Sequence, residues 1–395
     1  MLALLLAVIY MSFISLGLPD SLLGGGWPIM YREFDVPVSY SGIIFFIISA
    51  GTVASSLMSD RVTKKLGTGK VTAISVAITA GALLGFSFST AFWHLCILAI
   101  PYGLGAGSVD AALNNYVALH YKSRHMSWLH CMWGVGASVG PYIMSAVLTN
   151  GGTWNNGYRT VGIIQVVLSV FLFMSLPLWK KAPEQDIASD VSDSEYKDRP
   201  IPLKDVVRFR GAKEIMLTFF CYSAIEQTCS LWASGYMVFD RGIDAAKAAG
   251  YAGLFFIGIT VGRALSGFLT MKFNDDQMMR IGEAVIALGI ILIFLPFDIT
   301  IIIGLVTVGF GCAPVYPSII HSTPVHFGRD KSQAMVGIQM AAAYVGTTLM
   351  PPVFGLIAEH ISVKIFPIYL TIFLILMTIM YETVVKKTAG GIKDA

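Results

Sequence analysis

Stretches of about 20 mostly apolar residues, separated by short polar links, recur twelve times along the 395-residue chain. About 20 residues is the length that a helix needs to cross the hydrocarbon core of a bilayer. Only 13% of the residues are charged, whereas about 25% is usual in soluble domains. The sequence therefore predicts an all-α membrane protein with twelve transmembrane helices. We place these helices at 3–28, 38–58, 71–91, 94–119, 128–148, 159–179, 212–239, 246–270, 279–297, 299–321, 333–357 and 362–383.

The longest polar segment, 180–211, separates six apolar segments from six others. We expect it to be a cytoplasmic linker between an N-terminal bundle at 1–179 and a C-terminal bundle at 212–395. Most of the 27 Lys and Arg residues lie in this linker, in the C-terminal tail and in links that would share one side with the N-terminus. Cytoplasmic loops are enriched in Lys and Arg. We therefore expect both termini in the cytoplasm and a multi-pass protein of the cell membrane.

The two halves of the chain resemble each other. GLGAGSV at 103–109 aligns with GFGCAPV at 309–315 at an offset of 206 residues. The offset drifts to 210 further along, where GASVGP at 136–141 matches GTTLMP at 346–351. Two six-helix repeats with a substrate site between them are the plan of a large class of transporters. The repeat therefore predicts two pseudo-symmetric bundles and a transport function.

Three acids within the predicted spans stand out: Asp20, Asp110 and Glu226. An acid near the middle of a span costs roughly 2.5–3.5 kcal/mol on insertion scales, and it almost always faces a cavity or a partner. We predict that these acids couple transport to an ion. At the offset of 206, Asp20 matches Glu226, whereas Asp110 matches Tyr316. Because Tyr stays protonated near neutral pH, we expect coupling mainly in the N-terminal half and substrate orientation mainly in the C-terminal half.

Asp110 is followed by Asn114 and Asn115, and its spacing of four from Asn114 places these two side chains on one helical face. Asp20 lies in LGLPDSLLGGGWP, where Pro and Gly would leave backbone groups unpaired. Membranes tolerate such a break only beside a cavity or neighbouring protein. Two structural alternatives stay open: Asp110 bonded to a neighbouring helix, and Asp20 as the cap of a short helix.

Further polar and aromatic residues are candidates for substrate binding. Glu226, Gln227 and Trp232 together suit a polyol, since polar groups can bind hydroxyls and an aromatic face can cover a sugar ring; Trp232 is equally suited to the interfacial aromatic belt. His130 and Trp133 share a helix face, and His130 is either a proton relay or a structural hydrogen-bonding residue. If the repeat alignment holds, the cavity of the second half is also lined by Tyr316 and Gln339.

Charged residues at two other places suggest a role in gating. Arg263 is the one Lys or Arg that we place well inside a span, away from its ends. It would either pair with an acid to latch a gate or extend to the cytoplasmic face. Asp60 and Arg61 are expected to hold the inner ends of helices together.

The motifs resemble those of a known family. SDRVTKKLGTGK at 59–70 is similar to the loop signature of the major facilitator superfamily, with Ser56 where that signature begins with Gly, and GVGASVGP at 134–141 resembles its fifth-helix Gly-Pro motif. Asp110-x-x-x-Asn114 together with Asp20 resembles the fucose:proton symporter branch. The resemblance implies that Asp20 and Asp110 serve in proton coupling and sugar binding. Because Asp110 replaces the Glu of that branch and Glu226 is an additional acid, the choice between proton and sodium stays open.

Catalytic, phosphate-binding and metal-binding motifs are not found in the sequence. GTGK at 67–70 lacks the first Gly and the trailing Ser or Thr of a phosphate loop, and the five cysteines are scattered in apolar runs. We therefore expect a transporter, not an enzyme, without a cofactor and without a nucleic-acid partner, acting as a monomer in the bilayer. The leading hypothesis is proton-coupled symport of a sugar or small polyol. The alternatives are a proton-coupled antiporter that exports drugs or metabolites and a non-transporting receptor or scaffold.

Overall fold

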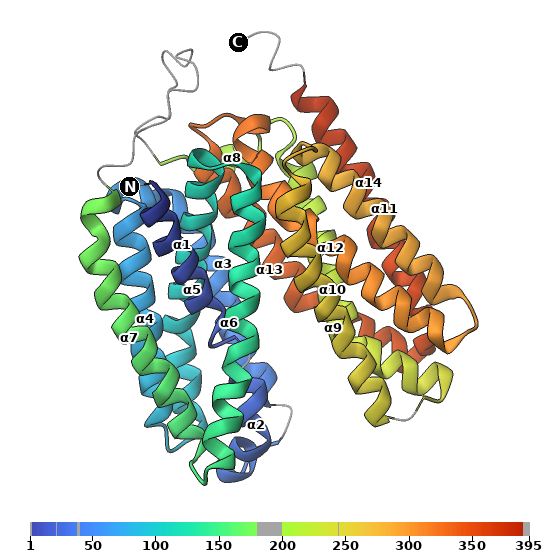
Figure 1. Cartoon of the computed structure of the whole chain (residues 1–395), viewed down its shortest axis with the longest axis horizontal. Coiled ribbons are helices and arrows are strands. Elements are labelled where there is room, and N and C mark those ends of the chain that lie inside the picture. Colours follow the sequence, from blue (N-terminus) through green and yellow to red (C-terminus); the bar gives the residue numbers. More distant parts are fainter. Residues whose placement is uncertain (1, 21, 38–39, 180–199, 244, 390–395) are drawn as a thin grey trace. The chain divides into compact units, whose positions relative to one another are not determined.

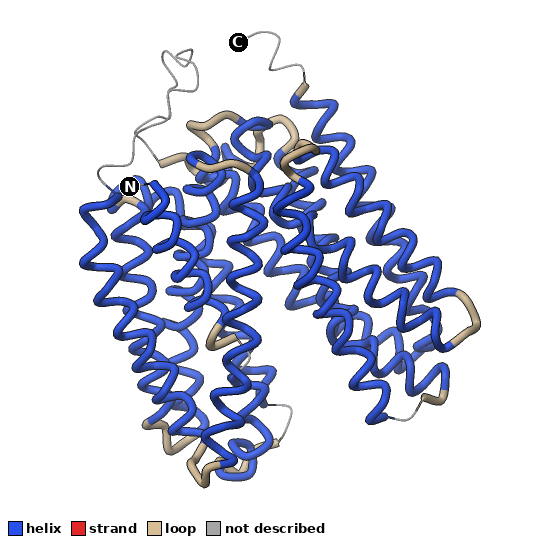
Figure 2. The backbone as a smooth tube through the Cα atoms, in the orientation of Figure 1, coloured by secondary structure: helices blue, strands red, loops and turns tan. Residues whose placement is uncertain are grey.

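The computed structural model describes residues 2–20, 22–37, 40–179, 200–243 and 245–389. Within these ranges the chain consists of helices joined by short loops, and no β-strand is present (Figure 2). Most of the predicted linker, 180–199, lies outside the described residues. The chain divides into two compact units, which we call unit 1 (Met1–Tyr116 and Leu129–Ile201) and unit 2 (Val117–Trp128 and Pro202–Ala395).

Unit 1 is built from the first seven helices, which run from blue to green in Figure 1. They are α1 (Leu2–Gly17), α2 (Leu22–Glu33), α3 (Ser41–Leu66), α4 (Thr68–Ser87), α5 (Phe92–His120), α6 (Ser123–Thr149) and α7 (Trp154–Trp179). The first predicted span thus forms two helices, with Asp20 in the break between them.

Unit 2 contains the remaining helices together with the facing ends of α5 and α6. Its elements are α8 (Leu203–Val206), α9 (Ala212–Arg241), α10 (Ala245–Leu269), α11 (Asp275–Phe294), α12 (Asp298–Phe327), α13 (Ser332–Ile357), a π-turn (Ala358–Ser362), a 3₁₀ turn (Val363–Ile365) and α14 (Phe366–Thr388). The α5–α6 connection belongs to unit 2 because its backbone is hydrogen-bonded to a side chain of α12. The Nε2 of His321 lies 2.9 Å from the carbonyl oxygen of Tyr121, and its Nδ1 lies 2.6 Å from the Asp275 carboxylate.

The described residues hold ten stretches that are long and apolar enough to cross a membrane. One of them, Ser332–Thr388, is 57 residues long and contains both α13 and α14. The 30-residue α9 is not among the ten, and it carries Glu226 and Gln227 in its middle. These helices account for the twelve predicted spans, and the expected all-α membrane fold is confirmed.

Glycines let the helices of unit 1 approach closely. A Cβ atom at Gly103 would lie well inside 3.0 Å of the Ile48 carbonyl oxygen, so α5 can rest against α3 only because that position has no side chain. On the α4 side, a Cβ atom at Gly105 would come within 2.9 Å of the Ser75 carbonyl oxygen. Small residues at such crossings allow the close packing on which helix association in membranes depends.

The same crossings recur in unit 2. Gly309 of α12 meets the backbone of Phe255 in α10, as Gly103 meets that of Ile48. Gly311 meets the Gly282 carbonyl oxygen in α11, as Gly105 meets that of Ser75. In each of these two pairs of contacts, the glycines are 206 residues apart in the sequence and their partners are 207 residues apart. The internal repeat is therefore visible in the packing of each unit, and not only in the apolar sequence.

A third pair of crossings carries the shifted part of the alignment. Gly136 of α6 packs on the Ile14 carbonyl oxygen of α1, and Gly346 of α13 packs on the Phe220 carbonyl oxygen of α9. The glycines are 210 residues apart and their partners 206 apart. The drift in offset thus reflects four additional residues between the α12 and α13 crossings, and the helix contacts stay equivalent.

These crossings generate a prediction about stability. Gly103→Ala and its repeat partner Gly309→Ala should each destabilise the protein by about 1–3 kcal/mol, the range for overpacking a close contact. The measurement is the thermal unfolding of the purified protein in detergent. Gly81→Ala is the control: Gly81 lies on an exposed face of α4 with no atom within 4 Å of its would-be Cβ, so Ala should be neutral or stabilising there. Equal melting temperatures for all three variants would refute the close-packing role.

Candidate functional site

Asp20 occupies the break between α1 and α2, where its carboxylate accepts two hydrogen bonds. Trp133 donates from Nε1 to Asp20 Oδ2 at 2.9 Å, and Tyr102 donates its hydroxyl to Oδ1 at 3.4 Å. The Asp20 residue is exposed, whereas Tyr102 is buried. Both donors are neutral. The carboxylate is therefore held in place by hydrogen bonds from two neutral donors.

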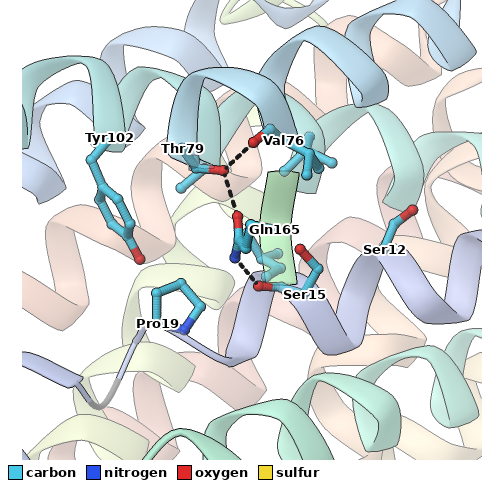
Figure 3. Close-up of a pocket in the computed structure, with 10 residues that line it drawn as sticks. Ser12, Ser15, Pro19, Val76, Thr79, Tyr102 and Gln165 are labelled. Atoms are coloured by element: carbon cyan, nitrogen blue, oxygen red, sulfur yellow. Dashed lines mark hydrogen bonds between the residues drawn. The ribbon is translucent and has the colours of Figure 1, made fainter. Parts of the chain in front are cut away.

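The break itself is stabilised by Gln165 of α7. Pro19 has no N–H, so the carbonyl of Ser15 loses the donor that a continuous helix would supply. Gln165 replaces it, donating from Nε2 to the Ser15 carbonyl oxygen at 2.6 Å (Figure 3). Its own Oε1 accepts a bond from the Thr79 hydroxyl at 2.9 Å. Sequence reasoning did not single out Gln165, although a buried amide in an apolar span is a signal that could have found it.

A small cavity lies next to this support and is drawn in Figure 3. Its volume is about 10 Å³, which is room for about one water molecule. Its polar lining comes from Ser12, Ser15, Thr79 and Gln165. A cavity of this size can hydrate the break in α1, but it is too small to hold a sugar.

A second group of polar residues surrounds Asp110 in the interior of unit 1. Asn114 donates from Nδ2 to Asp110 Oδ1 at 2.8 Å, and His130 Nε2 lies 3.0 Å from Asn114 Oδ1. All three residues are buried. Because an amide oxygen can only accept, His130 donates from Nε2 in this arrangement. The result is a chain of hydrogen bonds that runs from the ring of His130 through Asn114 to the carboxylate.

Helix α6 is linked to both acids of unit 1, directly to Asp20 and through Asn114 to Asp110. His130 reaches Asp110 through Asn114, and Trp133, three residues later on the same face, reaches Asp20 directly. His130 also packs its ring edge-on against Phe13 of α1 at a centroid distance of 5.4 Å. The structure thus brings together five of the residues selected from the sequence. Asn115 is buried beside them.

Unit 2 holds the third acid, and its partner is a cation. Arg263 Nη2 of α10 lies 3.4 Å from Glu226 Oε1 of α9. Arg263 is buried, while Glu226 and Gln227 are half-buried. Of the two possibilities left open by the sequence, the structure shows pairing with an acid.

The remaining substrate candidates of unit 2 have different surroundings. Trp232 donates from Nε1 to the Pro351 carbonyl oxygen at 3.0 Å and borders a groove of about 590 Å³ that also contacts Phe239 and Glu359. Tyr316 is half-buried against Phe219. Gln339 is fully buried and accepts a hydrogen bond from Thr323 at 3.0 Å. Gln339 therefore joins α13 to α12 and presents no accessible surface.

The two gating candidates of α3 have different roles. Asp60 is buried and accepts a 2.8 Å hydrogen bond from the backbone N–H of Ile201, at the end of the linker. Its other oxygen lies 3.3 Å from Lys64 Nζ. Arg61 is exposed. Asp60 thus fixes the end of the linker to unit 1.

Comparison with known proteins identifies the family. The model of the Major Facilitator Superfamily matches residues 9–297 and 215–394. The chain belongs to this superfamily.

Within the described residues, no cluster of three or more His, Cys, Asp or Glu is placed to hold a metal ion.

Individual superfamily members resemble the chain at low identity. Bypass of stop codon protein 6 of Saccharomyces cerevisiae is 20% identical, covering 96% of this chain and 82% of its own length. The glucose/mannose transporter GlcP of Bacillus subtilis is also 20% identical, covering 78% and 77%. The solved structure of FucP in the outward conformation has a TM-score of 0.77 at 16% identity, covering 95% of this chain and 98% of FucP. FucP is the Escherichia coli fucose:proton symporter.

The support of the α1 break by Gln165 can be tested directly. Gln165→Leu keeps a similar volume but leaves the Ser15 carbonyl without its donor, so we expect a loss of about 1–3 kcal/mol in stability. Thermal unfolding of the purified variant measures it. Ser169→Ala is the matched control on α7, because the Ala73 carbonyl that Ser169 contacts at 3.4 Å retains a helical N–H partner. If Gln165→Leu unfolds at the wild-type temperature, the amide is not needed at the break.

Proposed function

We propose that the protein is a secondary active transporter that takes up a sugar or small polyol together with a proton by alternating access. The observation that carries this proposal is the pair of carboxylates in unit 1, Asp20 and Asp110, which share helix α6 as a neighbour. The relatives support the substrate class, since GlcP is a glucose/mannose transporter and FucP a fucose:proton symporter. We further propose a monomer in the cell membrane with both termini in the cytoplasm.

The partners of the acids favour unit 1 as the coupling unit. Asp20 is held by an indole and a phenol, and Asp110 by an amide. A carboxylate whose hydrogen-bond donors are neutral, as those of Asp20 are, can take up and release a proton without breaking an ion pair. Glu226, which aligns with Asp20 at the offset of 206, instead faces the guanidinium of Arg263. The two acids at equivalent positions of the repeat therefore differ in their partners, which are neutral for Asp20 and cationic for Glu226.

The energy available from one proton is sufficient for useful accumulation. Moving one charge down a potential of 100 mV releases about 2.3 kcal/mol. At about 1.4 kcal/mol per factor of ten, this corresponds to roughly fiftyfold accumulation. Export of apolar drugs by proton antiport would favour an apolar binding surface. The polar side chains of Asp20 and of the half-buried Gln227 favour a hydroxylated substrate instead.

The proposal is tested by uptake into proteoliposomes that contain the purified protein. The probes are labelled L-fucose, D-glucose and D-mannose, and the pH and sodium gradients are imposed separately. We expect concentrative uptake of at least one sugar driven by the pH gradient alone. Uptake that follows only the sodium gradient would overturn proton coupling, and no uptake of any of the three would overturn neutral sugars as the substrate class.

The variant Asp110→Asn tests the coupling role. The amide retains much of the hydrogen-bonding shape but cannot titrate, so steady-state accumulation at 100 mV should fall from as much as about fiftyfold to about onefold. Exchange of labelled for unlabelled sugar should remain measurable. Glu382→Gln serves as the matched control, because it removes an acid that pairs with Arg280 on the exposed surface of unit 2. Wild-type accumulation in Asp110→Asn would remove Asp110 from the mechanism.

A further inference from the structure

The ion pair between Glu226 and Arg263 has a longer N···O distance than the Arg280–Glu382 pair of the same unit. Arg280 binds Glu382 through two contacts, at 2.6 and 3.1 Å. Arg263 meets Glu226 at 3.4 Å through Nη2, whereas charge-assisted N–H···O bonds are usually about 2.7–2.9 Å long. Glu226 therefore supplies the negative charge that Arg263 needs without the close two-point contact that a guanidinium can make.

The order of burial places the carboxylate on the accessible side. The side chain of Glu226 is 23% exposed, while that of Arg263 is 5% exposed. The phenols of Tyr222 and Tyr316 lie close enough to Arg263 to interact with it electrostatically. Glu226 is thus the more accessible of the two charged side chains, and the guanidinium of Arg263 is the more deeply buried. Gln227 and Tyr316, both half-buried, offer hydrogen-bonding groups beside the pair.

A buried guanidinium requires an anion at all times, because an uncompensated buried charge is strongly destabilising. A carboxylate matches the planar fork of Arg through two parallel hydrogen bonds. A carboxylate carried by a small molecule could therefore replace Glu226 and make a better contact with Arg263.

We propose that Arg263 binds a carboxylate of the transported molecule and that Glu226 is the internal anion which this carboxylate displaces. The substrate class is then a hydroxylated carboxylic acid, such as a sugar acid. This inference rests on the proposed transport function and narrows its substrate from sugars and polyols in general.

Thermal unfolding of the full-length protein in detergent, titrated with D-glucuronate or D-glucose, tests the proposal. The two probes differ at carbon 6, where one has a carboxylate and the other a hydroxymethyl group, and sodium chloride controls for the counter-ion. A ligand that binds the folded state raises the melting temperature, and the stabilisation grows with the logarithm of 1 + L/Kd, where L is the free ligand concentration. We expect glucuronate to stabilise the wild-type protein more than glucose does at equal concentration.

Substitutions of the two paired residues should change glucuronate binding in opposite directions. Glu226→Gln removes the internal competitor, so the ligand-free protein should melt at a lower temperature while its apparent Kd for glucuronate falls about tenfold, the order expected for one charged hydrogen-bonding partner. Arg263→Gln should abolish the response to glucuronate. Arg280→Gln is the matched control, which removes a guanidinium from the exposed Arg280–Glu382 pair and should leave the glucuronate response unchanged.

Three results would overturn the inference: equal stabilisation by glucose and glucuronate, weaker glucuronate binding in Glu226→Gln, or no glucuronate response in that variant. Glu226→Gln keeps the test decisive even if Arg263→Gln does not fold. Failure of this inference is separable from failure of the proposed function. Proton-driven uptake of glucose without a glucuronate preference removes the acid site alone, whereas glucuronate binding without proton-driven uptake removes the symport mechanism alone.

Discussion

The constraint on which the structure depends is the absence of water from the bilayer core. Every backbone N–H and C=O there must be paired within the protein, so the described residues form helices and short connections. The break between α1 and α2 is the instructive exception. Pro19 removes a donor, and Gln165 of α7 supplies another to the Ser15 carbonyl. Because Gln165 replaces the missing donor, Asp20 can lie outside the helix and accept hydrogen bonds from Trp133 and Tyr102.

The two repeats share their packing but not their chemistry. Gly103 and Gly309, and likewise Gly136 and Gly346, make equivalent crossings in the two units. The acids at matched positions have unlike partners, since Asp20 accepts from neutral groups and Glu226 faces Arg263. Duplication thus preserved the contacts that fix helix spacing, while the polar positions diverged. A division of labour, with coupling in unit 1 and substrate recognition in unit 2, fits this pattern.

Several candidates chosen from the sequence have structural surroundings that composition could not indicate. Gln339 was expected beside a cavity, but it is buried in a bond with Thr323. Asp60 lies in the loop signature of the superfamily, and it binds the backbone of Ile201, 141 residues away. Hydropathy reports how deep a residue lies along a helix axis. It does not report which way the side chain points around that axis. A helix that is apolar on all its faces has little amphipathic periodicity from which that direction could be predicted.

The sequence by itself determined the class of protein, the number and approximate ends of the spans and the internal repeat, and it singled out Asp20, Asp110 and Glu226 within the spans. These properties follow from segment length and apolar content, which are local. Only the tertiary structure decided the partners on other helices: Gln165 at the helix break, His130 bound to Asn114, and Arg263 opposite Glu226. These partners lie on different helices, and helix rotation and crossing are set by small residues that let two backbones approach. The chemistry of each acid is therefore fixed by packing between helices.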